Sequence, residues 1–157
     1  MRRCSSLLAI VLLGACSRSP DRGERAEQSH YVGAARCGEC HDAAHAFWNN
    51  TPHARAFFTL AKLGKTGDRA CITCHVTGFE KPGGHRGSAP AGLEAVQCEV
   101  CHGPGSRHAH TESLAAIQRE PPRSLCATCH RPPQVPDGWS LDAAWPKIIG
   151  PGHGESL

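Results

Sequence analysis

The sequence is poor in apolar residues and has almost no methionine. Hydrophobic residues make up 39% of the 157, below the roughly 45–50% of typical globular domains, while 17 Gly and 12 Pro indicate a loop-rich chain. We therefore expect bound cofactors to supply part of the apolar core. Met1 is the only methionine. Because Met1 would leave with a cleaved signal, no thioether ligand for a metal would remain.

Long apolar runs are also absent. The longest apolar run, residues 7–13, is too short to span a bilayer and follows the basic pair Arg2 and Arg3. This pattern predicts an export signal peptide over residues 1–15. We find no later stretch of spanning length.

The end of this signal, Leu-Gly-Ala-Cys at residues 13–16, resembles a bacterial lipobox. The resemblance implies cleavage before Cys16 and a lipid anchor on its thiol; an ordinary cleaved signal peptide is the alternative. We expect a flexible tether over residues 16–29 and one domain over residues 30–157. The protein is then expected on the periplasmic side of a bacterial membrane or at the cell surface, lipid-anchored.

Eight of the ten cysteines fall in four Cys-x-x-Cys-His motifs, separated by about thirty residues. Two thiols three residues apart lie about one helical turn apart and can bind the two vinyl groups of one porphyrin, and the next histidine ligates the iron. The motifs predict four covalent haem c groups. Their members are Cys37, Cys40 and His41; Cys71, Cys74 and His75; Cys98, Cys101 and His102; and Cys126, Cys129 and His130.

Two four-cysteine zinc sites and redox-active dithiols are the competing interpretations. Neither needs the histidine that follows each pair. With 11 histidines in 157 residues, four in that position by chance are improbable, so haem is favoured. Without the signal, 15 basic residues face 14 acidic ones, and haem propionates would add negative charge. Nucleic acid is therefore excluded as a partner.

Without methionine, each iron is either bis-histidine or open on one side. His53 begins the best predicted helix, where a neutral imidazole bound to iron avoids an unfavourable positive charge. His108 and His110 follow the third motif after a sharp Gly-Pro-Gly turn, and one of them is expected to be a ligand. His153, in the Gly-rich tail, is either a ligand or coil. His30 and His45 are expected at the surface.

The pattern of helix signals predicts a mainly α chain with extensive coil and little or no sheet. Thr51 as N-cap, Pro52 and Gly64 delimit a helix over residues 52–63, with Ala56, Phe57, Leu60 and Leu63 on one face. Shorter helices are expected over residues 41–48 and 112–119. Residues 78–92 and the tail from residue 131 are expected to be loops.

These residues resemble a family, the cytochrome c-554-like tetrahaem c-type cytochromes. The resemblance rests on YVGAARCGECHDAAHAFWNNTPHARAF, CITCHVTGF, GGH, LEAVQCEVCHGPGSRH and CATCH. It implies a mainly helical multihaem cytochrome c fold with closely packed haems, some in stacked pairs. It also implies distal ligands at His53 and at His108 or His110, and a further one beyond the fourth motif, where only His153 could serve.

The resemblance further implies that the haem of His75 is five-coordinate. His85 occupies a position where an aromatic residue is expected. If His85 bound the iron, it would fill the open coordination position of that haem. The tail is shorter and richer in Pro and Gly than the helical C-terminal region of the family.

The expected function is electron transfer between periplasmic or membrane-associated redox partner proteins. We find no nucleophile elbow, phosphate loop or paired-carboxylate signature. The alternative is an enzyme that reduces a small nitrogen oxide at an open haem near His75. A haem-bearing sensor or docking subunit is a third possibility that no sequence feature favours.

Overall fold

The structure is a computed structural model that describes residues 28–87 and 92–153. The predicted signal peptide, the lipidation site Cys16 and nearly all of the tether lie outside these residues. The described chain is mainly helical. In chain order its elements are α1 (Ala34–Gly38), α2 (Asp42–Asn49), the 3-10 turn His53–Arg55, α3 (Ala56–Lys62), α4 (Arg69–Ile72), α5 (Cys98–His102), α6 (Ser106–Thr111), the 3-10 turns Leu114–Ala116 and Arg123–Thr128, α7 (Leu141–Ala144) and the 3-10 turn Trp145–Lys147.

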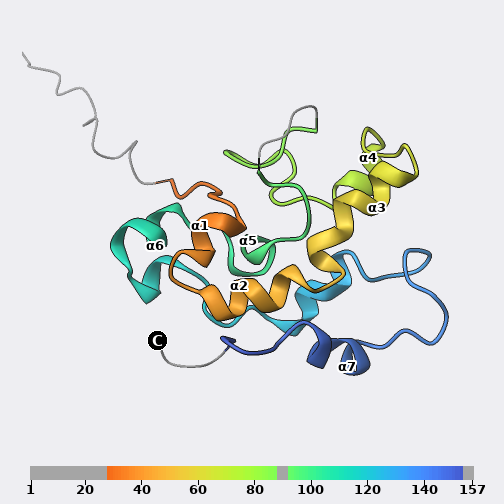
Figure 1. Ribbon diagram of the computed structural model, residues 1–157. Helices are drawn as coiled ribbons and strands as arrows, with labels where there is room; N and C mark the ends of the chain where they lie inside the picture. The colour runs from red at the N-terminus through yellow and green to blue at the C-terminus, as the bar shows by residue number, and fades with distance from the viewer. Residues whose placement is uncertain (1–27, 88–91, 154–157) are drawn as a thin grey trace, which may run out of the picture.

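The helices surround the third cysteine motif. Helix α5 lies near the middle of the molecule, with α1 and α6 on one side and α3 and α4 at the opposite end (Figure 1). Helix α1 packs against both α2 and α5, and α3 packs against α4. The C-terminal segment that contains α7 returns along the same side as α2 (Figure 1). No strand forms within residues 28–87 and 92–153, where Val76 and Glu94 make an isolated antiparallel bridge.

The protein core is small. Its buried hydrophobic residues in the described chain are Ala34, Leu60, Ile72, Val76, Leu93 and Ala95. Three of these, Leu60, Ile72 and Val76, form one cluster with partly buried aromatic neighbours. Such a core is less than a domain of this length normally needs. In the described residues, no helix has the length and apolar character to cross a membrane.

The predicted helix over residues 52–63 is present as two pieces, a 3-10 turn followed by α3. The Thr51 hydroxyl accepts from the Ala54 N–H at 3.4 Å, and Gly64 adopts a positive φ of 65° just past the helix end. Leu60 and Phe57 lie against the core as expected. Leu63, expected on the same face, lies outside the core and is 66% exposed.

Two other expectations were wrong. A helix over residues 112–119 does not form, because α6 ends at Thr111 and Glu112 takes a left-handed φ of 56°. Beyond it, Gln118 pairs with His102 through its backbone N–H and C=O, which an α-helix at Gln118 would not allow. The tail beyond residue 131 is not all loop, since Ser140 caps the short helix α7 by accepting from the Ala143 N–H at 3.2 Å.

Two leucines at the end of α3 give a matched test of the core. Leu60→Ala should lower the free energy of unfolding of the haem-loaded protein by about 2–4 kcal/mol, because Leu60 is buried and its removal leaves a cavity. Leu63→Ala should change the free energy by less than about 0.5 kcal/mol, since Leu63 is exposed. Denaturant unfolding followed by far-UV circular dichroism measures both. Equal losses would contradict this description of the core.

Candidate functional site

Each cysteine pair with its histidine occupies about one helical turn. Helix α5 contains the whole third motif, and the other three motifs overlap the end of a short helix. The backbone N–H of His41 bonds to the Cys37 carbonyl at 3.0 Å, and that of His130 bonds to Cys126 at 2.8 Å. These bonds keep the two thiols of a motif about one turn apart, next to the following imidazole. Within the described residues, the eight motif cysteines are free of disulfides.

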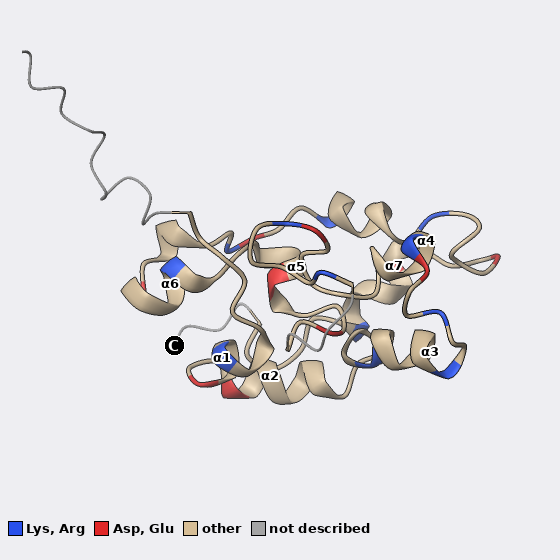
Figure 2. Cartoon of the chain, turned by 90° about the horizontal axis from the view of Figure 1, so that it is seen from above, with Lys and Arg blue, Asp and Glu red and all other residues tan. Residues whose placement is uncertain are grey.

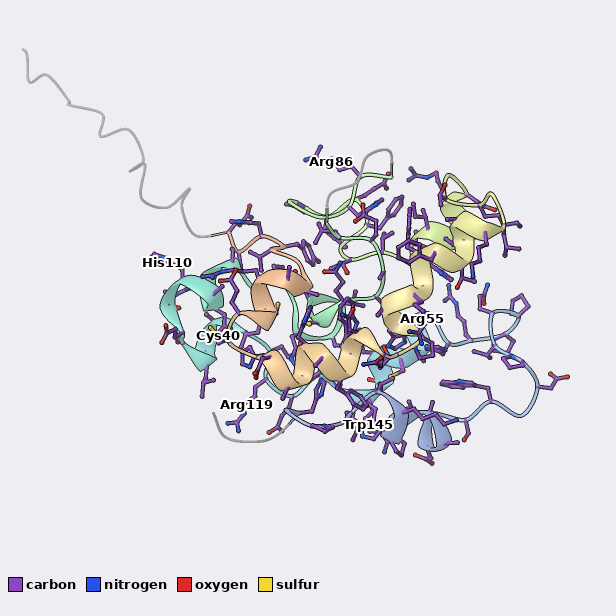
Figure 3. All side chains as sticks on the ribbon, in the orientation of Figure 1. Cys40, Arg55, Arg86, His110, Arg119 and Trp145 are labelled. Carbon is purple, nitrogen blue, oxygen red and sulfur yellow. The ribbon has the colours of Figure 1, made fainter. Side chains whose placement is uncertain are left out.

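Two motif histidines face histidines from distant parts of the chain. The rings of His41 and His108 have centres 6.2 Å apart and planes 21° apart. The rings of His53 and His130 have centres 5.9 Å apart and planes 45° apart. The sequence left His108 and His110 as alternatives, and the structure brings His108 to His41. His110 is exposed and lies at the outer edge of α6 (Figure 3).

The tail residue His153 interacts electrostatically with His102 of the third motif. His153 lies close enough to His102 for electrostatic interaction: partial desolvation, and then the His102 ring, lower the pKa of His153. The ring of Phe47 in α2 packs edge-on against His153, with ring centres 6.4 Å apart. The tail therefore brings the predicted site residue His153 back to the cysteine motifs, although little regular structure holds it there.

Backbone carbonyls fix three of the imidazole rings. Their Nδ1 atoms lie 2.7 Å from the Ala56 carbonyl for His75, 2.8 Å from that of Gln118 for His102, and 3.0 Å from that of Ser113 for His108. In each pair the carbonyl is an acceptor, so Nδ1 carries the proton and donates. In a neutral ring with this tautomer the lone pair lies on Nε2, which is the form of histidine that binds a metal.

Burial favours the neutral form of the paired rings of His53 and His130. Desolvation, and then the neighbouring His130, lower the pKa of His53. Desolvation also lowers the pKa of His130. A histidine must be deprotonated to ligate a metal, so both shifts favour the ligand form near neutral pH.

His75 differs from the other motif histidines. Among the described residues, no other histidine ring lies next to it. His85 is buried but held within its own loop: its Nδ1 accepts from the Gly87 N–H at 3.0 Å, and its Nε2 lies 3.7 Å from Glu94 Oε1. A neutral ring that accepts at Nδ1 carries its proton on Nε2. In this form His85 has no free ring nitrogen for a metal.

Thiols of different motifs meet in pairs. A hydrogen bond with Cys98, followed by burial, raises the pKa of the Cys37 thiol. Burial, followed by a hydrogen bond with Cys74, raises the pKa of Cys129 to about 11. Burial, and then Cys126, raise the pKa of Cys101. Neighbouring motifs in space are therefore the first and third, the third and fourth, and the fourth and second.

The described residues contain no group of three or more His, Cys, Asp or Glu side chains placed to hold a metal ion by themselves. The structure thus does not bring thiols together in the fours that the zinc alternative requires. It does place a cavity of about 650 Å³ beside His130, lined by Trp139 and several prolines of the tail.

Sequence reasoning gave no role at the site to three residues that shape it. Glu99, between the cysteines of the third motif, is buried and accepts several backbone N–H bonds. Trp139 stacks parallel to His130, with ring centres 4.8 Å apart. Trp48 donates its indole N–H to the Val96 carbonyl at 2.8 Å. Charged residues are usually exposed, as are aromatic residues in loops, so the sequence carried no signal for Glu99 or Trp139.

Comparisons with known proteins agree on one family. A family model described as cytochrome c554 and c-prime matches residues 36–103. Cytochrome c-554 of Nitrosomonas europaea is 35% identical over 112 residues, which are 60% of this chain and 48% of that protein. The chain thus spans about half the length of this curated relative.

A solved structure, the reduced state of cytochrome c554 from Nitrosomonas europaea, matches with a TM-score of 0.53 and 23% identity. The match covers 78% of this chain and 79% of that one. It confirms the predicted fold class: a mainly helical multihaem cytochrome fold, with no sheet in the described residues.

Proposed function

The chain is a cytochrome c-554-like protein, and on this premise we propose that it is a tetrahaem c-type cytochrome that carries electrons. Its redox partners are periplasmic or membrane-associated proteins, and a lipid on Cys16 anchors it to a bacterial membrane. One observation carries the proposal. Two motif histidines each face a histidine from a distant segment of the chain, with ring centres 6.2 and 5.9 Å apart.

These separations fit a metal between the rings. Two imidazoles on opposite sides of one metal ion have ring centres about 6 Å apart, because each metal–nitrogen bond is about 2 Å and each ring centre lies about 1 Å farther out. The fixed Nδ1 atoms and the burial of the rings fit the same role. The small protein core also leaves apolar volume that macrocycles would fill.

In the proposed arrangement the eight motif cysteines hold four haem c groups. The histidines that would hold the irons are His41 and His108, His130 and His53, and His102 and His153, while His75 would bind alone. Haem supplies a one-electron change of iron oxidation state. The chain contributes covalent attachment, two nitrogen ligands on three irons, and backbone carbonyls that hold the imidazole planes.

The thiol contacts support a spatial order that differs from the order in sequence. Cys37 meets Cys98, Cys101 lies near Cys126, and Cys129 meets Cys74. The four haems would then follow one another as first, third, fourth and second. A continuous row of neighbouring haems lets an electron enter at one end and leave at the other, which is what a carrier between two proteins requires.

The intact mass of protein from the exported fraction tests the proposal. We expect the mature polypeptide to carry four haem masses, together with the added acyl chains of a lipidated Cys16. A mass equal to the polypeptide alone, or to polypeptide plus lipid, would overturn the haem assignment. Four haems without added lipid would overturn only the anchor.

His108 and His110 offer a matched pair for the ligand assignment. His108→Ala should convert one low-spin haem to high spin, because the ring of His108 faces that of His41. His110→Ala should leave the spectrum unchanged, since His110 is exposed. Visible absorption and electron paramagnetic resonance of the ferric proteins distinguish the two. Four haem masses must remain in both variants, and the reverse result would transfer the ligand to His110.

A small-molecule reaction at the second motif is a second candidate, because no described histidine lies next to His75. Reduction of a nitrogen oxide there needs an open coordination position on the metal. We expect the ferric wild-type protein to show one high-spin signal in electron paramagnetic resonance. Four low-spin haems would exclude this second function and would leave electron carriage in place.

A further inference from the structure

Glu99 is a carboxylate buried inside the third haem-binding turn. Its side chain is only 2% exposed, and it stands between Cys98 and Cys101 on α5. Oε1 accepts from the N–H of Val32 at 3.0 Å and of Gly105 at 2.7 Å. Oε2 accepts from the N–H of Val32 at 3.1 Å and of Gly33 at 2.8 Å.

These bonds identify the side chain as ionised. Both oxygens are engaged as acceptors, whereas a protonated carboxyl group would present a hydroxyl donor to the same N–H groups. The partners are neutral amides, which orient dipoles toward the carboxylate without cancelling its charge. A full negative charge is therefore held inside the protein, near the middle of the molecule, where α5 lies in two views (Figure 1 and Figure 2).

The charge acts on its surroundings. Burial, and then Glu99, raise the pKa of Tyr31. After the larger effects of Cys98 and of burial, Glu99 also helps to raise the pKa of the Cys37 thiol. At Cys98, the hydrogen bond with Cys37 is the largest effect and lowers the thiol pKa, while Glu99 acts in the opposite direction. One carboxylate thus lies within electrostatic reach of sulfurs from the first and third motifs.

We infer that Glu99 is a redox-tuning residue that lowers the reduction potential of the haem held by Cys98 and Cys101, and of the neighbouring haem on Cys37. The inference rests on the proposed function. Ferric haem carries one more positive charge than ferrous haem, so a fixed negative charge stabilises the oxidised form. In a poorly solvated interior this interaction is screened far less than it would be in water.

A neutral neighbour shows that tethering alone does not require a charge. Gln97, two residues earlier, is also buried and holds the same N-terminal segment: its Oε1 accepts from the Ala34 N–H at 2.6 Å. Its Nε2 donates to the carbonyls of Gly92 and Glu94, both at 2.9 Å. Gln97 holds the segment by accepting at one atom and donating at the other, whereas the partners of Glu99 are all N–H donors. The bonds of Glu99 therefore need an acceptor at both positions, and the carboxylate that supplies them also places a charge in the interior.

Glu99→Gln tests the inference, with two matched controls. Spectroelectrochemical titration should show at least one of the four potentials raised by about 59 mV or more, a tenfold change in the equilibrium constant for one-electron reduction. Glu99→Asp disturbs the same bonds but keeps the charge. Gln97→Met breaks the neighbouring tether without changing charge. Both controls should keep the wild-type potentials within a small fraction of that shift.

Intact mass is measured on each variant first, so that the two proposals can fail separately. Absence of haem from the wild-type protein would end the proposed function. Four haems with unmoved potentials in Glu99→Gln would overturn the tuning role alone. Equal shifts in Glu99→Gln and Gln97→Met would also overturn it, because they would show a structural cause.

A second variant applies if Glu99→Gln yields no haem-loaded protein. Val32→Lys places a positive charge on the residue whose N–H contacts both carboxylate oxygens. Val32 is only partly buried, so a longer side chain can be accommodated at this position. The added charge opposes that of Glu99, and the potential of the same haem should rise. An unchanged potential in this variant would overturn the inference.

Discussion

Everything in this molecule is arranged around four single helical turns, each of which presents two thiols and an imidazole. Such a turn has few contacts of its own, and most of the chain between the motifs forms short helices and loops. The distant histidines His53, His108 and His153 are then brought to the motifs by separate segments. In the proposed holoprotein, metal–ligand bonds would join segments that a small core joins only weakly.

The motifs, the fold class and the helix α2 could be read from the sequence because local rules decide them. The partner of His41 could not, since His108 and His110 lie two residues apart on the same short helix. Which of the two rings faces His41 depends on where α6 begins and on the hydrogen bond between His108 and the Ser113 carbonyl. The helix expected over residues 112–119 failed for a related reason: pairing of Gln118 with His102 overrides local helix propensity.

The order of the four motifs in space could not be predicted from the sequence either. The motifs are nearly evenly spaced along the chain, yet the thiol contacts run from the first to the third, the fourth and then the second. The second motif is displaced to one end because α3 and α4 pack against each other, away from α1 and α6 (Figure 1). In the proposed function, His75 is the motif histidine without a partner histidine. The haem that it would bind therefore lies at one end of the row of four haems.

The first described residues are hydrogen-bonded to the turn that follows the third motif. The Ser29 hydroxyl donates to the Pro104 carbonyl at 2.6 Å, and the His30 N–H donates to the Ser106 hydroxyl at 2.8 Å. A force on the preceding chain is therefore shared between the backbone that leads to α1 and these bonds to the turn after His102. If the chain is held to a membrane at Cys16, the attachment point of the domain is the turn that follows His102, and thermal tumbling of the domain would pivot there. The row of haems would then sweep an arc about that turn, with its His75 end travelling farthest.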